Sequence, residues 1–364
     1  MKYWNARTQA LLPYVPGEQP RGQVLIKLNT NENPYPPSPK VIEAIKNAAG
    51  DTLRLYPDPE SLELREAIAD VYRVKPAQVF AGNGSDEVLG FAFGAYFQEE
   101  IIFPEITYSF YPVYAKLWDI PFRTIPLEDD FSISPDKLMS PADGAIFPNP
   151  NAPTGTALPP AEIRRILAYH ARRDRVVLVD EAYGAFAEEP GAAQPQGIGA
   201  LSMTPYIEEY PNLLTVHTLS KMGSLVGLRV GFAIGSEELI EGLRRIRDSF
   251  NSYPVDRLAQ AGGTAALRDM AYYREIAGRI IATRKRVAEA LMALGFQALP
   301  SQANFIFARM PGKSGAALQA GLRERGILVR RFSQPKIQDF LRITIGTDDE
   351  MNALLDACAA LIKE

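Results

Sequence analysis

The stretch PAEIRRILAYHARRDRVVLVD, residues 160–180, joins two patterns that together decide the fold. Its first half places Ile163, Leu167 and His170 on one helical face, so it predicts an amphipathic helix. Its second half contains an unbroken apolar run, residues 176–179, which is typical of a strand buried on both faces. A helix followed at once by such a strand indicates an α/β sheet.

The same alternation continues on both sides of this stretch. Apolar residues at helical spacing predict a helix around residues 64–71, and a short strand follows at 78–81. Residues 213–216 and 230–234 repeat the buried-strand pattern. Strands that alternate with helices imply right-handed crossovers and a mostly parallel sheet, so we predict an α/β protein with helices flanking that sheet.

The last third of the chain has a different pattern. A long helical pattern over residues 271–294 stops at Gly295, a suitable left-handed cap. A capping box from Thr347 to Glu350 predicts the start of a final helix. Between them we expect short strands at 304–308, 327–329 and 341–345. This third therefore predicts a second, smaller α+β unit.

Three regions follow from these patterns. Residues 1–44 are rich in proline, which disfavours regular helix, and are expected to form an N-terminal arm. We expect the arm to contribute to the small domain and to a subunit contact. Residues 45–245 form the predicted large domain, and residues 246–364 the predicted small C-terminal domain.

The composition excludes several classes of function. The 364 residues include 39 Lys plus Arg and 43 Asp plus Glu, a balance that argues against a nucleic-acid binder. The chain has one cysteine and two histidines, so we expect no disulfide scaffold, no zinc–cysteine site and no multi-histidine metal site. Without a signal pattern or a long apolar run, the expectation is a cytoplasmic protein with no membrane segment.

Two motifs in the first half of the chain suggest a site for an anionic, planar ligand. In VFAGNGSDEVLG, a strand turns into a helix at Gly84, Ser85 and Asp86, where backbone N–H groups can bind an anion. Ordinary helix capping explains the same residues equally well. In PEITYSFY, Tyr108 follows a strand and could stack on a planar ring, or serve in packing as most aromatic residues do.

Two further motifs follow predicted strands of the sheet. The loop FPNPNAPTG, residues 147–155, lies at a strand's carboxyl end, where open α/β sheets bind ligands. Asp180 ends the next buried strand, and a carboxylate there needs a positive or hydrogen-bonding partner. A protonated heterocyclic nitrogen would be such a partner, and Tyr183 is close enough in sequence to reach the same ligand.

Lys221 and Arg229 lie in VHTLSKMGSLVGLRVGF, directly after another buried strand. Small residues around Lys221 leave room for a bulky adduct, and loss of solvation lowers a lysine's pKa and makes it a Schiff-base nucleophile. Arg229 can bind a phosphate with two parallel hydrogen bonds. The alternative for Lys221 alone is a solvated surface charge.

Taken together and in this order, the motifs GSDE, PEITY, NPNAPTG, DEAY and TLSKMGSLVGLRVG resemble the class I/II aminotransferases, fold type I enzymes that use pyridoxal phosphate. The resemblance implies that Lys221 forms the Schiff base with the cofactor and that Asp180 pairs with the pyridinium nitrogen. It places Tyr183 on the ring's phenolic oxygen and Tyr108 on the ring face. The residues implied to hold the cofactor phosphate are Gly84, Ser85, Asp86, Ser220 and Arg229.

One position departs from the family pattern. The family carries an asparagine immediately before Pro-Thr-Gly, where its amide contacts the ring oxygen, whereas this chain has Ala152. Asn151 stands one residue earlier, and whether it replaces that amide is left open by the sequence.

Within this family the chain is most similar to the histidinol-phosphate aminotransferases, through KLNTNENPYPPSP, LRLYPDP, SQANFIFAR, GILVRRF and FLRITIGT. This similarity implies that Arg330 and Arg342 hold the substrate's anionic end, although Arg331 is an alternative to its neighbour. Residues implied to complete the substrate site are Tyr14, Asn31, Asn304 and Tyr56, the last supplied by a second subunit of a homodimer.

The implied reaction is transamination of histidinol phosphate in histidine biosynthesis, with the glutamate/2-oxoglutarate pair as partner. The same motifs also fit an aromatic-amino-acid aminotransferase or a phosphothreonine decarboxylase of this fold. A non-catalytic cofactor-binding module of a transcription regulator is disfavoured because no basic domain precedes the arm. A dinucleotide-dependent oxidoreductase is disfavoured because the glycine fingerprint is incomplete and Lys221 is unexplained.

Overall fold

The computed structural model describes residues 2–14, 17–20, 25–188 and 199–363, and its larger sheet has seven strands. In spatial order these are β2 (Val79–Asn83), β8 (Val230–Gly235), β7 (Leu213–Thr218), β6 (Val176–Asp180), β5 (Gly144–Pro148), β3 (Ile101–Pro104) and β4 (Phe122–Ile125). Only β8 runs against its neighbours, β2 and β7, and the other pairs are parallel. The predicted α/β fold with a mostly parallel sheet is confirmed.

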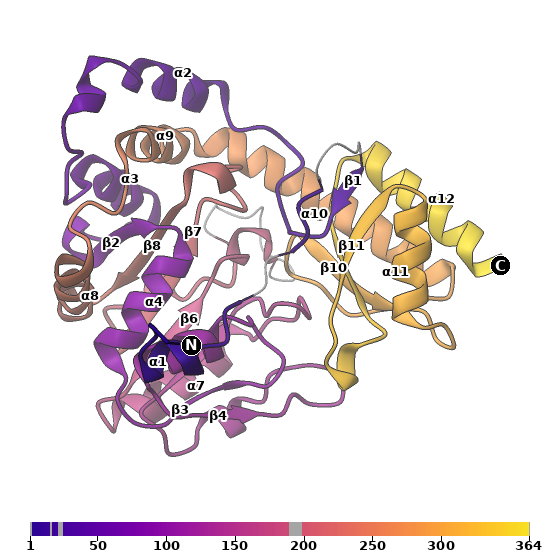
Figure 1. Ribbon diagram of the computed structural model, residues 1–364, viewed down its shortest axis with the longest axis horizontal. Helices are drawn as coiled ribbons and strands as arrows, with labels where there is room; N and C mark the ends of the chain where they lie inside the picture. The colour runs from indigo at the N-terminus through magenta and orange to yellow at the C-terminus, as the bar shows by residue number, and fades with distance from the viewer. Residues whose placement is uncertain (1, 15–16, 21–24, 189–198, 364) are drawn as a thin grey trace.

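A second sheet of five strands is built mainly from the C-terminal third (Figure 1). Its order is β1 (Ile26–Leu28), β11 (Ile327–Arg331), β12 (Leu341–Thr344), β10 (Phe305–Arg309) and β9 (Gln297–Ala298). The first of these strands comes from the proline-rich arm and pairs in parallel with β11, with Ile26 opposite Ile327. The arm is therefore part of the second sheet, and nearly 300 residues of chain separate the two paired strands.

Helices cover both faces of the large sheet. On one face apolar residues pack against α4 (Ser85–Tyr96), α5 (Tyr111–Trp118) and α8 (Glu237–Phe250). On the other they pack against α3 (Leu62–Tyr72), α7 (Pro160–Ala171), α9 (Arg257–Leu267) and α10 (Met270–Ala293). Side chains of β6 alternate between these faces, since Val177 and Val179 join one cluster and Leu178 the other. This alternation explains the unbroken apolar run in the sequence.

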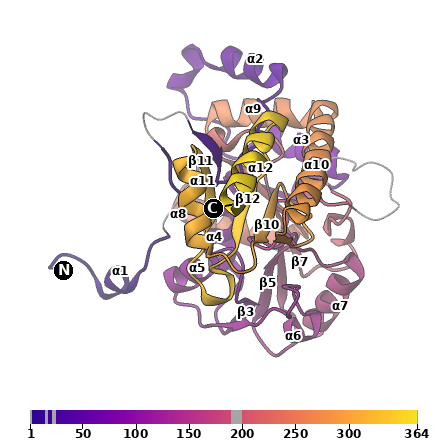
Figure 2. The same ribbon diagram turned by 90° about the vertical axis from the view of Figure 1, so that its right-hand side faces the viewer.

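The remaining helices are α1 (Ala6–Ala10), α2 (Pro39–Ala48), α6 (Pro135–Leu138), α11 (Gly315–Glu324) and α12 (Asp348–Lys363). Helix α1 has no buried residue, and Figure 2 shows it standing away from the body of the molecule. None of the helices in the described part of the chain combines the length and apolar character needed to cross a lipid bilayer.

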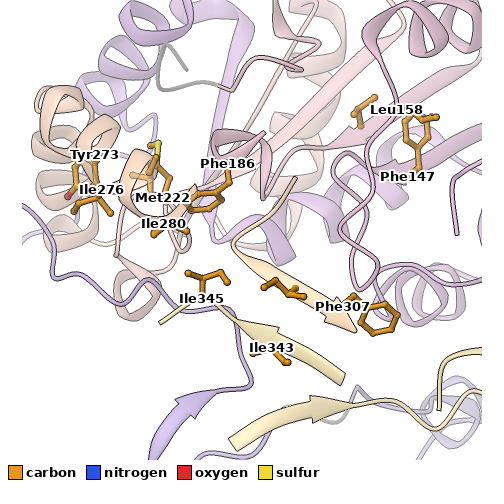
Figure 3. Packing of buried hydrophobic residues seen from close by; sticks show 14 of the residues in the cluster. Phe147, Leu158, Phe186, Met222, Tyr273, Ile276, Ile280, Phe307, Ile343 and Ile345 are labelled. Atoms are coloured by element: carbon orange, nitrogen blue, oxygen red, sulfur yellow. The ribbon is translucent and has the colours of Figure 1, made fainter. Parts of the chain in front are cut away.

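One apolar cluster joins the large sheet to the second sheet (Figure 3). It extends from Tyr273 and Ile280 of α10, past Phe186, to Phe307 and Ile343 of the second sheet. These side chains are all at most 1% exposed. Because buried aromatic and aliphatic side chains pack densely, the cluster fixes the strands that carry the pocket residues described below.

The predicted element ends need small corrections. The strand expected at 78–81 is β2, which begins one residue later because Gln78 closes a short 3-10 turn, Pro76–Gln78. The strand expected at 304–308 is β10, which begins and ends one residue later, and the Asn304 side chain before it donates to the arm. The long helix does end before Gly295, whose φ of +94° is the left-handed conformation that glycine tolerates best.

Candidate active site

A pocket lies where the carboxyl ends of β6 and β7 meet the arm and the second sheet. Its lining includes most of the residues that the sequence singled out. From the large sheet and its loops these are Ser85, Asp86, Tyr108, Asp180, Tyr183, Ser220, Lys221 and Arg229. From the arm and the second sheet they are Tyr14, Arg330 and Arg342. Gly84, Asn31, Asn151, Asn304 and Tyr56 do not line it.

Lys221 follows β7 and points into the pocket. Its Nζ donates a 3.2 Å hydrogen bond to the carbonyl oxygen of Thr30. Burial, and secondarily the charge of Arg342, lowers the pKa of Lys221 to about 8. Asn33 supports the segment from behind, because its Nδ2 donates to the carbonyls of Lys221 and Met222. The lysine is therefore held by the arm and has a larger neutral fraction at neutral pH than a solvated lysine.

Asp180 ends β6 and is buried at the floor of the pocket. One carboxylate oxygen accepts a hydrogen bond from the backbone N–H of Ala182, and the other accepts one from the Tyr111 hydroxyl, each at 3.1 Å. Burial raises the pKa of Asp180 to about 6, against the effect of these two bonds. Since no ion pair to Asp180 occurs among the described residues, a protonated ligand group would meet a carboxylate with no cationic partner.

Arg229 forms a cationic corner at the N-terminus of α4. Its guanidinium donates to Ser220 Oγ at 3.2 Å and to Asp86 Oδ2 at 3.0 Å. Gly84 has a φ of +83°, and a Cβ there would lie 2.5 Å from Arg229 Nη2. Only glycine leaves room for the arginine against the first backbone N–H groups of the helix, so the corner has the geometry of an anion site.

Tyr108 lies over this corner. Its hydroxyl donates to Asp86 Oδ1 at 2.7 Å, and its ring meets Tyr111 edge-on, with the ring centroids 5.8 Å apart. The Asp86 carboxylate is therefore occupied by Arg229 and Tyr108. Its contact with an anion in the corner would come from its backbone N–H.

Tyr183 faces Lys221 from the loop after β6, with its ring centroid 6.0 Å from Lys221 Nζ. Its hydroxyl accepts a 2.8 Å hydrogen bond from Asn31 Nδ2. Asn304 Nδ2 in turn donates to the Asn31 carbonyl at 3.1 Å. Asn31 and Asn304, expected at the mouth of the pocket, thus lie behind its wall and support Tyr183.

Two arginines enter the pocket from the second sheet. Arg342 on β12 donates to the Asn29 carbonyl at 3.1 Å, and burial lowers the pKa of its guanidinium. Arg330 on β11 also lines the pocket, whereas Arg331 bonds to the carbonyls of Phe332 and Gln338. The geometry therefore selects Arg330 over its neighbour as the pocket residue.

Tyr14 and Tyr56 differ in their surroundings. The Tyr14 ring stacks on Phe110 at 4.5 Å and lines the pocket. Tyr56 is 79% exposed, stacks on Tyr253 and lies outside the pocket of its own chain. Tyr56 therefore does not contribute to the pocket of its own chain.

Asn151 is turned away from the pocket. Its Nδ2 donates to the Ile106 carbonyl and to Thr154 Oγ1, both at 3.0 Å. Ala152 does line the pocket and packs beside Tyr183 and Phe305. In this geometry Asn151 supports the loop and does not stand in for an amide at position 152.

Sequence reasoning missed four supporting residues: Thr30, Asn33, Tyr111 and Thr344. Thr30 acts through its backbone carbonyl, which carries no sequence signal. Asn33 and Tyr111 stand inside the quoted motifs KLNTNENPYPPSP and PEITYSFY, and their polar side chains were the available signal. Thr344 is 313 residues from its partner Asn31, so only the fold reveals it.

The comparisons agree with this geometry. The family model described as aminotransferase class I and II matches residues 23–358. The histidinol-phosphate aminotransferase 2 of Thiobacillus denitrificans is 55% identical over 363 residues, covering 99% of this chain and 98% of that one. The histidinol-phosphate aminotransferase 1 of Bordetella parapertussis is 55% identical over 361 residues, covering 98% of each.

A solved structure gives the same result at lower identity. The histidinol-phosphate aminotransferase of Sinorhizobium meliloti, in complex with pyridoxal-5'-phosphate, superposes with a TM-score of 0.84 and 25% identity, covering 100% of this chain and 98% of that one. Fold, family model and relatives therefore converge, and the chain belongs to the class I and II aminotransferase family.

Proposed function

We propose that this protein is a pyridoxal-phosphate-dependent aminotransferase that transfers the amino group of histidinol phosphate to 2-oxoglutarate, as a step of histidine biosynthesis. One observation carries the proposal: a single pocket brings together a lysine of lowered pKa, a buried carboxylate without a cation, and three arginines. The names of the relatives at 55% identity support the choice of substrate.

The pocket residues fit the cofactor. Gly84 and Gly231 form a cradle that a side chain would fill, because a Cβ on Gly231 would lie 2.2 Å from the Ser85 nitrogen. The cradle opens on Arg229, which suits a phosphate. Asp180 suits a protonated ring nitrogen, and Lys221 is placed to hold the aldehyde carbon covalently.

When bound, pyridoxal phosphate supplies an electron sink for negative charge that develops at the donor's α-carbon. Asp180 keeps the ring nitrogen protonated by pairing with it. Lys221 Nζ, with its pKa lowered to about 8, takes the proton from the α-carbon as a general base. Tyr108 and Tyr183 restrict the ring's position, and the buried surroundings exclude water from the reacting atoms.

Arg330 and Arg342 are proposed to bind the anionic end of either substrate, with the Tyr14 hydroxyl beside them. Guanidinium groups donate paired hydrogen bonds to a phosphate or to a carboxylate. One pocket can therefore bind the amino donor and the amino acceptor in turn. We also infer a homodimer in which Tyr56 completes the pocket of the other subunit, since it is exposed and outside its own pocket. The proposed biosynthetic role supports a cytoplasmic location.

The test has two parts. Borohydride reduction of the purified protein should attach the cofactor irreversibly to a peptide containing Lys221, seen by mass spectrometry. K221A should lose this attachment and lose transamination by at least about 10⁴-fold. K46A, which removes an exposed lysine, should behave as wild type.

Histidinol phosphate, phenylalanine and phosphothreonine are then compared with the same enzyme, measuring transamination and carbon dioxide release. We expect kcat/KM to be highest for transamination of histidinol phosphate. A higher value for phenylalanine would identify an aromatic aminotransferase, and carbon dioxide from phosphothreonine a decarboxylase. No cofactor retention at all would overturn the enzyme assignment.

A further inference from the structure

The pocket wall around Ala152 lacks a polar group that the family pattern provides. Ala152 packs beside Tyr183 and Phe305, and the neighbouring amide of Asn151 is bonded to the loop instead. Tyr183, which packs against this part of the wall and also lines the pocket, carries a hydroxyl that can supply a polar group here. The direction in which that hydroxyl donates its proton therefore matters more in this chain than in a pocket where an asparagine at this position also offers a hydrogen bond to the ligand.

The contact with Asn31 decides that direction. An amide nitrogen is only a donor, so in the 2.8 Å contact the Tyr183 oxygen must accept. The proton of Tyr183 is consequently free to be donated elsewhere. With the Asn31 side chain behind the wall and the pocket in front, the open direction leads into the pocket.

Thr344 determines which end of the Asn31 amide faces Tyr183. The Thr344 hydroxyl donates to Asn31 Oδ1 at 3.1 Å and accepts from the Asn31 backbone N–H at 3.0 Å. With Oδ1 bonded in this way, Nδ2 faces Tyr183, whereas a reversed amide would deprive the Thr344 proton of this acceptor. A reversed amide would put an acceptor against Tyr183 and would draw its proton away from the pocket.

Burial and backbone conformation reinforce the arrangement. Asn31 is 1% exposed and Thr344 is 2% exposed, so water does not compete with their bonds. Asn31 has a φ of +56°, a left-handed conformation that asparagine and aspartate tolerate better than most residues. Thr344 stands two residues after Arg342 on β12, so one strand carries both the pocket arginine and this support.

We propose that Thr344 and Asn31 are positioning residues that keep the Tyr183 hydroxyl donating into the pocket, where it takes the place of the amide that Ala152 lacks. The inference rests on the proposed function for the identity of the acceptor, the cofactor's phenolic oxygen. The charged groups that face Tyr183 are Lys221, Arg342 and Asp180, and Tyr14 also lies near. None of these four is altered by the variants below.

The variants are T344V, which removes the hydroxyl at nearly constant shape, T344S, which keeps it, and N31D, which replaces the donor by an acceptor. We measure the dissociation constant for pyridoxal phosphate and the pH at which the bound cofactor's visible absorption changes. T344V and N31D should weaken cofactor binding by about tenfold and move the absorption change to higher pH, because an anionic oxygen loses a hydrogen bond. T344S should match the wild type.

A double-mutant cycle with Y183F separates this role from general damage to the fold. If Thr344 acts through the Tyr183 hydroxyl, T344V should have little effect in the Y183F background. An equal loss in both backgrounds, or a T344S variant as impaired as T344V, would overturn the proposal.

A cofactor-free measurement keeps this result distinct from failure of the proposed function. The ¹³Cζ NMR signal of Tyr183, identified by its absence in Y183F, should shift in T344V and N31D and stay in place in T344S. If these shifts appear but the wild type does not transaminate, the positioning stands and the function is wrong. If transamination is normal and the signal never shifts, the positioning is wrong.

Discussion

The pocket has two walls of different construction. The sheet wall consists of Ser85, Asp86, Asp180, Ser220, Lys221 and Arg229. The arm wall consists of Tyr14, Asn29, Thr30, Arg330 and Arg342. Residues of the sheet wall lie within a few residues of strand ends of one sheet, whereas those of the arm wall are joined by bonds such as Arg342 to Asn29, 313 residues apart.

This difference separates two tasks. The sheet wall holds the groups that handle protons and charge at the reacting atoms, Lys221 and Asp180, on rigid strand ends. The arm wall holds the cationic groups proposed for the substrate's anionic end. Variants of the sheet wall should therefore lower kcat, and variants of the arm wall should mainly raise KM.

Among variants that keep Lys221, the sheet wall should give the largest effect, in D180N. A neutral amide cannot keep a ring nitrogen protonated, so we expect kcat to fall by about 10²- to 10³-fold with little change in KM. Steady-state kinetics with histidinol phosphate measure this. The adjacent E181Q is the matched control, because Glu181 points to the opposite face of β6 and does not line the pocket. A D180N variant that changed only KM would remove the distinction between the walls.

The arm wall gives the next largest effect, in R330A. Loss of one guanidinium from the pocket should raise KM for histidinol phosphate by about tenfold to a hundredfold, with a smaller change in kcat. R331A removes the neighbouring arginine, which bonds to backbone carbonyls outside the pocket, and should keep KM near the wild-type value. Equal effects of the two variants would contradict the geometric choice of Arg330.

The two walls also differ in how far the sequence could predict them. Asp180 and Lys221 were predictable because each lies at or just after the end of a buried apolar run, where a polar residue needs a ligand or a partner. Arg229 stands directly before the next such run and was predictable from its place in the Lys221 motif, as a guanidinium that can bind a phosphate. Asn31 and Asn304 were expected to line the pocket, but they support it from behind.

This difference between the expected and the observed positions of Asn31 and Asn304 has a physical cause. Motif resemblance identifies residues near a site but carries no information about which way a side chain turns. Orientation depends on hydrogen bonds between distant segments, as in Thr344 with Asn31, or Tyr111 with Asp180. The strand β1 was missed for the same reason, because three residues become a strand only through their pairing with β11.

A smaller effect, on cofactor affinity, is expected from Y111F, which removes the hydrogen bond from Tyr111 to Asp180 of the sheet wall. The Tyr111 hydroxyl donates to Asp180 and opposes the effect of burial, which raises the pKa of Asp180 to about 6. Without that bond the pKa of Asp180 should rise further. The carboxylate would then take up its proton at a higher pH than in the wild type. On acidification, affinity for the protonated cofactor ring should therefore begin to fall at a higher pH in Y111F than in the wild type.

The measurement is the dissociation constant of pyridoxal phosphate against pH. Y114F is the matched control, since the buried Tyr114 hydroxyl has no hydrogen-bond partner among the described residues. We expect Y111F to weaken binding by a few fold near pH 6 and Y114F to follow the wild type. If both variants gave the same curve, Tyr111 would act only in packing.

The smallest effect on catalysis is expected from E181Q, whose consequence lies in stability. Glu181 is buried behind β6, where its carboxyl accepts hydrogen bonds from Ser202 Oγ and from the Met203 N–H. Burial raises the pKa of Glu181 to about 8, above its ordinary value of 4.5. The folded chain therefore keeps a proton that the unfolded chain releases, and this part of the stability is lost as the pH rises from about 4.5 to about 8.

A glutamine at position 181 has no such proton to lose. The free energy of unfolding of E181Q relative to wild type should rise by on the order of 2–4 kcal/mol across that pH range and then level off. Denaturant unfolding at several pH values measures it, with E43Q as an exposed control that should follow the wild type. A flat difference would mean that Glu181 is ionised inside the fold. The two carboxylates at the end of β6 would then differ only in their access to the pocket, and not in their charge at neutral pH.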